Sequence, residues 1–143
     1  MPLQPCFNLK WRQADRVLTG LYNAHFRDLD IKITQFSVLR AVKLMKSTSQ
    51  KALEQVLLVD QATLTRSLQP LIRQGFIERQ PSPEDGRIML VSLSDDGKTL
   101  YKKAEKRWEA AQQQVSDILG DEALDQLLAA SDALIKLNSS DTQ

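Results

Sequence analysis

The segment from residue 50 to residue 75 restricts the fold more than any other part of the sequence. Apolar residues recur at helical spacing over 50–58 and again over 61–74. Asp60 precedes the second segment, where a carboxylate can accept hydrogen bonds from the free amides of a first turn. Gly75 follows it, as glycine does after the last turn of a helix. Two short helices joined by a tight turn are therefore predicted.

A β-hairpin is predicted directly after these helices. Residues 76–79 and 87–93 are rich in β-branched and apolar side chains. Between them, residues 81–86 have the sequence Pro-Ser-Pro-Glu-Asp-Gly, which is typical of a turn. Two short helices followed by a hairpin form a winged helix-turn-helix.

Helical spacing also precedes this region. Apolar residues recur through the first 30 residues, and a break with a mixed pattern follows over 29–33. Thr34 is expected to cap a mostly buried helix that runs to Met45. The polar residues 47–49 are expected to form only a connector.

Two further helices are expected after the hairpin. Ser94 is predicted to cap a helix that ends near Leu119, where Gly120 interrupts the pattern. The last helix covers 122–137, and the tail is expected to be frayed from Asn138 onward.

The sequence thus predicts a mainly α fold with a small β-hairpin wing. A winged helix-turn-helix DNA-binding domain over 34–94 is flanked by helices over 1–33 and 95–143. These helices are too long and too apolar to serve a monomer of 143 residues. We therefore expect them to form the dimerisation region of a homodimer.

Charge is distributed unevenly along the chain. The formal net charge is only +1, but residues 34–90 hold eight Lys and Arg against five Asp and Glu. Residues 94–143 hold six against ten. The central region is therefore the part suited to face nucleic-acid phosphates, although ordinary solvated surfaces reach such a balance too.

The supply of catalytic and metal-binding side chains is small. The chain has one His and one Cys, both in the first predicted helix. Zinc needs three or four good ligands, and an enzyme needs a nucleophile with its base or a carboxylate pair. We therefore expect no catalytic residue, metal or cofactor. A winged-helix module that binds only proteins is the remaining alternative, but its recognition face would lack the arginines found here.

The N-terminus carries no basic stretch followed by an apolar run, and no run approaches the roughly 18 residues of a membrane span. A single Cys forms no internal disulfide. These features favour a cytoplasmic protein that does not enter a membrane.

The second short helix has two distinct faces. At 100° per residue, Leu68, Leu71 and Ile72 fall within about 80° of Leu64 and form the core face. The other faces are polar, and N-terminal residues of such a helix contact bases in the major groove of DNA. The predicted DNA-binding residues on this helix are Gln61, Thr63, Thr65, Arg66, Gln69 and Arg73. An ordinary amphipathic helix with a solvated outer face would show the same periodicity.

Arg79 and Arg87 are expected at the two ends of the hairpin turn, where a wing places arginine in the minor groove. Asp85 is expected to hold Arg87 by a charge-assisted hydrogen bond. A surface ion pair without function is the simpler interpretation of the same residues.

The sequence resembles the MarR (multiple antibiotic resistance regulator) family in four stretches that follow the family's order. The first resembles Leu-Thr-x-x-Gln-x-x-Val-Leu, with the Thr-to-Gln spacing compressed. The second is the helix start with the residues after it, the third is the Asp-x-Arg of the wing, and the fourth is the strand and helix start that follow. They are Ile33–Leu39, Val59–Arg66 with Leu71 and Gly75–Arg79, Asp85–Arg87, and Val91–Gly97. The likeness is dense over residues 33–97.

This resemblance implies a triangular dimer whose first and last two helices interlock. It also implies binding to a pseudo-palindromic operator in double-stranded DNA, and release by a small ligand or an oxidant. Two residues depart from the pattern. Pro70 removes a hydrogen bond to the carbonyl of Arg66 and is expected to kink or loosen the helix. Leu58 stands where many relatives have Gly or a small residue.

Cys6 is the candidate redox sensor. The residues Cys6-Phe7-Asn8-Leu9 resemble the start of the first helix in members that sense organic hydroperoxides. A helix N-terminus favours the thiolate, and oxidation of the thiolate could disturb a dimer. Those sensors have Tyr four residues after the Cys, whereas this chain has Lys10. An incidental Cys is the alternative.

A small phenolic or apolar ligand is the second candidate signal. The residues predicted to line its pocket are Trp11, Tyr22, His25 and Phe36, with Phe7 and Phe26 nearby in the sequence pattern. Aromatic residues at helical spacing more often belong to a core, and a single His more often lies satisfied at an interface.

Overall fold

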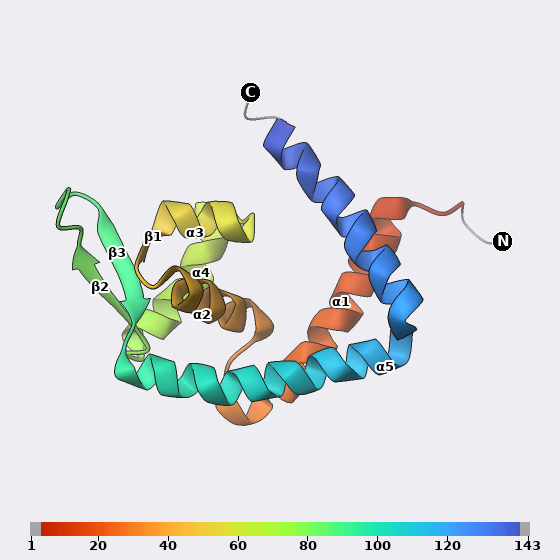
Figure 1. Cartoon of the computed structure of the whole chain (residues 1–143), viewed down its shortest axis with the longest axis horizontal. Helices are drawn as coiled ribbons and strands as arrows, with labels where there is room; N and C mark the ends of the chain where they lie inside the picture. The colour runs from red at the N-terminus through yellow and green to blue at the C-terminus, as the bar shows by residue number, and fades with distance from the viewer. Residues whose placement is uncertain (1–3, 141–143) are drawn as a thin grey trace. The chain divides into compact units, whose positions relative to one another are not determined.

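Helices dominate the structure, a computed structural model that describes residues 4–140, with side chains up to residue 138 (Figure 1). It divides after Trp108 into two units, and the second unit consists of the rest of the last helix. In chain order, the elements are α1 (Phe7–His25), the 3₁₀ helix η1 (Arg27–Leu29), α2 (Ile33–Met45), β1 (Thr48–Ser49), α3 (Gln50–Leu57), α4 (Gln61–Arg73), β2 (Ile77–Pro81), β3 (Met89–Leu93) and α5 (Asp95–Ser140). The predicted winged helix-turn-helix is therefore confirmed as α2 to β3.

The hairpin belongs to a three-stranded antiparallel sheet in the order β1-β3-β2. β1 was expected to be a connector, but Thr48 pairs with Val91 and is buried. A two-residue strand is too short to show an alternating pattern, so the sequence could not indicate it. The loop covers 82–88 instead of 81–86, because Pro81 pairs with Met89 at the end of β2. Proline is tolerated there because β2 is an edge strand.

The start of α2 differs from its prediction. Its N-cap is Lys32, not Thr34. The side-chain oxygen of Gln35 accepts from the Lys32 N–H at 3.0 Å, and that of Asn23 accepts from the Ile33 N–H at 2.8 Å. One of these acceptors comes from α1, so a local search for a capping hydroxyl could not find it. α1 itself ends at His25, before the 30 residues assigned to it.

The predictions for α5 fit more closely. The Ser94 hydroxyl accepts from the Gly97 N–H at 3.0 Å and so caps the helix. Gly120 interrupts it with a non-helical φ of 78°. The helix then continues through Asn138, where a frayed tail was expected. Despite the length of α5, no described helix is both long and apolar enough to cross a membrane.

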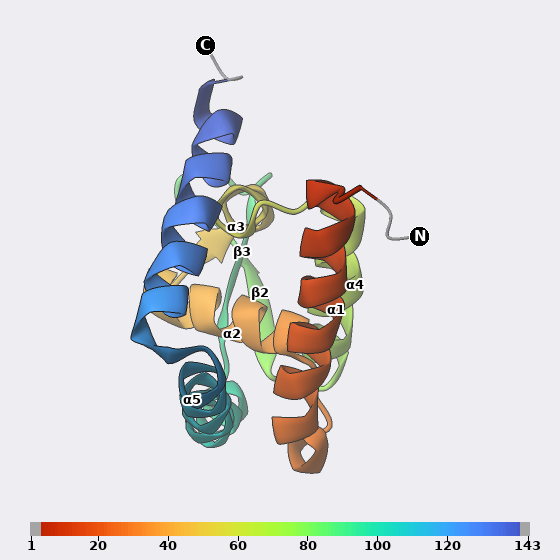
Figure 2. The same cartoon turned by 90° about the vertical axis from the view of Figure 1, so that its right-hand side faces the viewer.

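The core of the first unit gathers around α2. Phe36 is buried, and its ring stacks at 5.3 Å on Phe26, 5.7 Å on Tyr101 and 5.8 Å on Trp108, measured between centroids. Two of these partners lie on the beginning of α5, which α2 crosses (Figure 2). The aromatic stack therefore fastens the winged helix to α5.

A second attachment joins the end of α4 to the start of α5. The Ser94 hydroxyl donates to the carbonyl of Gly75 at 2.5 Å. A Cβ on Gly97 would lie 2.0 Å from the carbonyl oxygen of Phe76, so only glycine fits there. Because backbone meets backbone at this point, the position of β2 relative to the start of α5 is fixed.

Large apolar side chains remain uncovered in both units. α1 has no buried residue, and Phe7 at its start is 85% exposed. In the second unit, Leu127 and Leu128 are followed seven residues later by Leu134 and Ile135. The exposed apolar residues on its last helical segment include Leu127, Leu128, Leu134, Ile135 and Leu137. Contiguous exposed apolar residues of this kind indicate an interaction surface.

Candidate nucleic-acid interface

α4 is built as the sequence predicted on its inner side. Leu64, Leu68 and Leu71 are buried, which confirms the core face of the helical wheel. Asp60 caps the helix, because its carboxylate accepts from the Thr63 N–H at 2.7 Å. Hydrogen bonds from the backbone and side chain of Thr63 hold the pKa of Asp60 below its usual value. The cap thus stays charged at neutral pH.

The outer side of α4 presents polar groups from its first two turns. Gln61 and Arg66 are exposed, and Thr63 is half-buried. The Arg66 guanidinium donates to the Thr63 hydroxyl at 3.2 Å. This contact orients the arginine along the N-terminal half of the helix. There the free amides of the first turn and the helix dipole favour a phosphate.

Thr65 faces a different neighbour. Its hydroxyl accepts from the Gln50 side-chain amide at 3.2 Å, and the residue is half-buried. Gln50 begins α3, and no motif in the sequence marks it as a contact of α4. The pair therefore ties the two helices of the helix-turn-helix together, which leaves Thr65 less free to contact DNA than its neighbours.

The C-terminal half of α4 carries the other two predicted contacts, Arg73, which is exposed, and Gln69, which is half-buried. Pro70 lies between them without interrupting the helix, which runs continuously to Arg73. The Gln74 N–H donates to the Pro70 carbonyl at 3.0 Å, so helical bonding resumes directly after the proline. α4 is therefore continuous through Pro70, and the kink or loosening expected there stays a prediction.

The turn between α3 and α4 uses an unusual residue. Leu58 has a left-handed conformation with φ 53° and ψ 47°, and its N–H donates to the carbonyl of Glu54. Residues other than glycine and asparagine rarely adopt this left-handed conformation. The turn therefore keeps the geometry that glycine would give, at a conformational cost.

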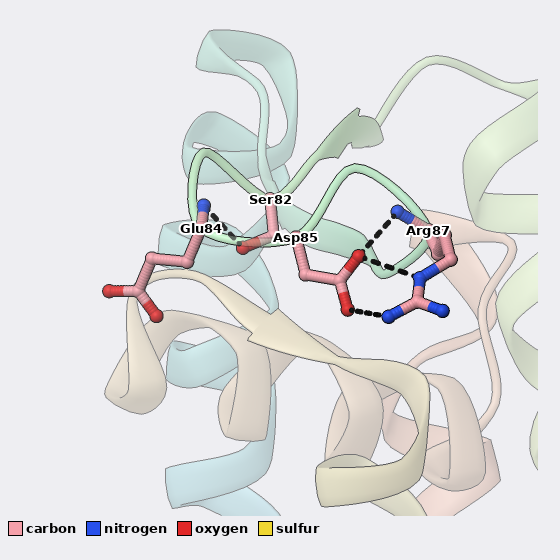
Figure 3. A network of polar contacts seen from close by, with 4 residues as sticks. All are labelled: Ser82, Glu84, Asp85 and Arg87. Carbon is pink, nitrogen blue, oxygen red and sulfur yellow. Dashed lines mark hydrogen bonds and ion pairs between the residues drawn. The ribbon is translucent and has the colours of Figure 1, made fainter.

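The wing presents an arginine that the loop itself orients (Figure 3). The Asp85 carboxylate accepts from the Arg87 N–H at 3.1 Å, from its Nε at 3.1 Å and from its Nη2 at 3.2 Å. Side-chain hydrogen bonds from Arg87 hold the pKa of Asp85 below its usual value. The Arg87 side chain is nevertheless 91% exposed. It is thus held in place while its outer face stays available.

The rest of the loop supports this arrangement. The Ser82 N–H donates to the Ile88 carbonyl at 2.8 Å, and the Ser82 hydroxyl accepts from the Glu84 N–H at 3.3 Å. Arg79, in contrast, is not at the end of the turn as predicted. It pairs with Val91 in the middle of β2, because that strand continues to Pro81.

The structure therefore forms two groups from the predicted residues. One contains Thr63 and Arg66 on α4, and the other contains Asp85 and Arg87 in the wing. Each arginine is oriented by a neighbour within three residues along the chain. Such groups suit the phosphates and base edges of a duplex, because guanidinium groups offer several donors in a planar array.

Cys6 is exposed and occupies the N-cap of α1, as its prediction required. Its thiol makes no capping hydrogen bond. The Lys10 N–H donates to the Cys6 carbonyl at 2.9 Å, which is an ordinary helical bond. The position is thus accessible to an oxidant.

The four residues predicted to line a ligand pocket occupy different environments. Phe36 is buried in the aromatic stack, and Trp11 is 45% exposed. Tyr22 packs against the core, and burial raises its pKa, while His25 is half-buried. Trp11 and Tyr22 are separated by about 16 Å along α1, at 1.5 Å per residue. Trp11 therefore lies far along the helix from the other predicted lining residues of α1.

Comparisons with known proteins agree on one group. The model of the MarR family matches residues 29–88. The multiple antibiotic resistance protein MarR of Salmonella typhimurium is 36% identical over 107 residues, which cover 75% of this chain and 72% of that protein. The organic hydroperoxide resistance transcriptional regulator of Bacillus subtilis is 34% identical over 101 residues, covering 71% of this chain and 67% of that protein.

A solved structure shows a similar fold in the presence of DNA. A crystal structure of a mutant MarR from E. coli, complexed with operator DNA, is similar with a TM-score of 0.81 and 26% identity. The similarity covers 89% of this chain and 91% of the E. coli chain.

Proposed function

Because this chain belongs to the MarR family of DNA-binding transcriptional regulators, we propose that it is a homodimeric repressor of a pseudo-palindromic operator. The observation that carries the proposal is the pair of oriented arginines, Arg66 on α4 and Arg87 in the wing. The operator complex of the similar E. coli protein supports it.

The N-terminal half of α4 enters the major groove. Gln61, Thr63 and Arg66 contact base edges or the phosphates beside them, and Gln69 and Arg73 follow along the same helix. Arg87 enters the adjacent minor groove, whose negative potential favours a guanidinium. Arg79 contributes from the edge strand β2.

Dimerisation supplies the second half-site. The exposed apolar residues of α1 and of the second unit are covered by the same elements of a second copy. Residues 1–33 and 95–143 thus form the dimerisation region, and 34–94 form the DNA-binding domain. The dimer works in the cytoplasm, where its operator lies.

The release signal is either an oxidant or a small apolar or phenolic ligand. The exposure of Cys6 at the start of α1 and the similarity to a hydroperoxide-resistance regulator support the oxidant. For the ligand, Trp11 lies about 16 Å along α1 from Tyr22 and farther from His25, so a site that includes all three would draw on surface from a partner subunit.

Fluorescence anisotropy on DNA from upstream of the protein's own gene tests the proposal. Arg66→Ala and Arg87→Ala are each expected to weaken binding by about 1–3 kcal/mol, because each removes a guanidinium contact. The matched control is Arg12→Ala on α1, which leaves both groups intact. Unchanged affinity in both test variants, with the dimer intact, would remove α4 and the wing from the DNA interface.

The same assay identifies the signal. Loss of binding after an organic hydroperoxide, with recovery after thiol and no loss in Cys6→Ser, assigns the oxidant. DNA binding that is unchanged by the oxidant would exclude Cys6 as the sensor. Phenolic ligands would then be tested. A protein that binds neither this DNA nor any fragment selected from the genome would instead be a protein-interaction module.

A further inference from the structure

A basic hollow lies beside the C-terminal end of β3, and its lining contains none of the residues proposed to bind DNA. It has a volume of about 500 Å³ and is lined by Lys43, Lys46, Ser92, Leu93, Lys98 and Lys102. The four lysines come from the end of α2 and the start of α5, which are far apart in the sequence. The hollow thus brings together four positive charges from two helices.

These charges have no acidic counterpart in the lining. The acids nearest in sequence are Asp95, Asp96 and Glu105, and none of them lines the hollow. Among the residues whose side chains the structure describes, none of the four lysines takes part in a salt bridge. Like charges at i and i+4 on one helix, as with Lys98 and Lys102, oppose each other. A bound anion would remove this repulsion.

The backbone holds one of the lysines in a rare conformation. Lys46 has φ 65° and ψ −60°, and the Ser47 N–H donates across it to the Met45 carbonyl at 2.8 Å. This is a strained three-residue γ-turn, where a side chain is disfavoured. Strained residues of this kind cluster at functional sites. A lysine at such a position suggests that its ammonium group is needed.

A second lysine is oriented by an aromatic ring. The Lys43 Nζ lies 4.7 Å from the centroid of the Tyr101 ring, in a cation–π contact. Tyr101 is buried in the core, so this contact anchors the ammonium group to a rigid element. The hollow is therefore partly organised before any ligand binds.

The position of the hollow separates it from the DNA-binding groups. The wing loop joins the sheet at Met89, whereas Ser92 and Leu93 lie at the opposite end of β3. The volume suits a small molecule. Lysine ammonium groups bind phosphate as point charges.

We propose that this lysine hollow binds a small molecule that carries a di- or triphosphate group, one molecule in each subunit. The four ammonium groups surround the phosphates, and the Ser92 hydroxyl lies beside them. The site is distinct from the DNA interface and does not depend on the proposed repression.

Titration calorimetry of the full-length protein with sodium tripolyphosphate, at constant ionic strength, tests the site. Saturable binding with one molecule per subunit is expected. Lys43→Gln combined with Lys98→Gln should weaken it by about a hundredfold, because each hydrogen bond between charged groups contributes roughly tenfold. The control is Lys10→Gln combined with Lys103→Gln, which removes the same charge outside the hollow and should leave binding unchanged.

Three results would overturn the proposal. The first is that tripolyphosphate shows no saturable binding when compared with a titration of sodium chloride at the same ionic strength. The second is an equal loss of tripolyphosphate affinity in both double variants, which would show that binding depends only on the overall charge of the protein. The third is a loss of DNA affinity in the Lys43 and Lys98 variant, without tripolyphosphate, as large as that of Arg66→Ala. That result would make the hollow a DNA contact. Far-ultraviolet circular dichroism serves to check that each variant is folded.

Discussion

The winged helix and the helices around it differ in how far one chain completes them. From α2 to β3, the apolar faces meet in a shared core, and the polar groups of α4 and the wing are held by neighbours. In contrast, α1 has no buried residue, and Leu128 in the second unit is 58% exposed. The first region buries its apolar faces within one chain, whereas the others leave large apolar side chains exposed.

This difference indicates what each surface binds. Arg66 and Arg87 are charged and already oriented, so water is displaced from them only by a ligand with matching acceptors, such as phosphates and base edges. The apolar side chains of α1 and of the second unit gain free energy simply by leaving water. A second copy of the same chain provides matching apolar surface.

The largest expected effect is on dimerisation. Leu128→Asp combined with Ile135→Asp places two charges on one face of the last helical segment, since the residues are seven apart. The dimer should weaken at least about a hundredfold, because interface centres tolerate unpaired charges poorly. Sedimentation velocity over a range of protein concentrations measures this change.

The matched control lies in the completed region. Leu44 in α2 is 68% exposed, so Leu44→Asp makes the same kind of change on a surface that we expect to remain in water. It should leave the dimer intact. Equal behaviour of the two variants would contradict the proposed difference between the regions.

Stability should respond in opposite directions to alanine at two helical glycines. Gly97→Ala is expected to destabilise the fold by about 1–3 kcal/mol, because its Cβ would overlap the Phe76 carbonyl. Gly20→Ala on α1 meets nothing within 4 Å and should stabilise the chain by up to about 1 kcal/mol. Chemical denaturation measures both. A stabilising Gly97→Ala would show that α5 and the start of β2 are not closely attached.

A smaller gain is expected at the helix-turn-helix. Leu58→Gly should raise the free energy of unfolding by roughly 0.5–1 kcal/mol, because glycine relieves the left-handed conformation but has more entropy to lose. Val56→Gly, within α3, should lower it by about as much. If both substitutions destabilise equally, the turn does not hold Leu58 at positive φ.

The smallest effect concerns pH. Arg87 lowers the pKa of Asp85, so the contact stabilises the wing above the usual aspartate pKa of about 3.9 and is lost as pH falls through the lower folded value. Carboxyl carbon chemical shifts should therefore give Asp85 a midpoint below about 3.9. The Arg87→Ala variant should raise it toward the usual value, although the backbone N–H of residue 87 still donates to the carboxylate. The same midpoint in both proteins would mean that the contact does not persist in solution.

Local patterns predicted the helices and the inner face of α4, because burial follows the periodicity of the chain. They also predicted the contact between Asp85 and Arg87, which are two residues apart. They could not predict the capping of α2 by Asn23 or the contact of Gln50 with Thr65. These contacts join residues that are 10 and 15 positions apart. Only the folded chain brings them together.

The bounds of the wing also depend on contacts that only the folded chain brings together. Pro81 was assigned to a turn by its composition, but edge strands accept proline, and Pro81 pairs with Met89. Which strand lies at an edge depends on the whole sheet, so Arg79 could not be placed correctly from its neighbours. Likewise, the lysine hollow is lined by residues from the end of α2 and the start of α5, and no local motif predicts it.

The central claim is that two completed winged helices are joined by the surfaces that one chain leaves open, and bind DNA together. Hydroxyl-radical footprinting on duplexes selected from genomic DNA tests it most directly. We expect two protected half-sites related by twofold symmetry, with centres about one helical turn or a multiple of it apart. Arg66→Ala should abolish both at the same protein concentration. A single protected half-site, or uniform protection without sequence preference, would contradict the account.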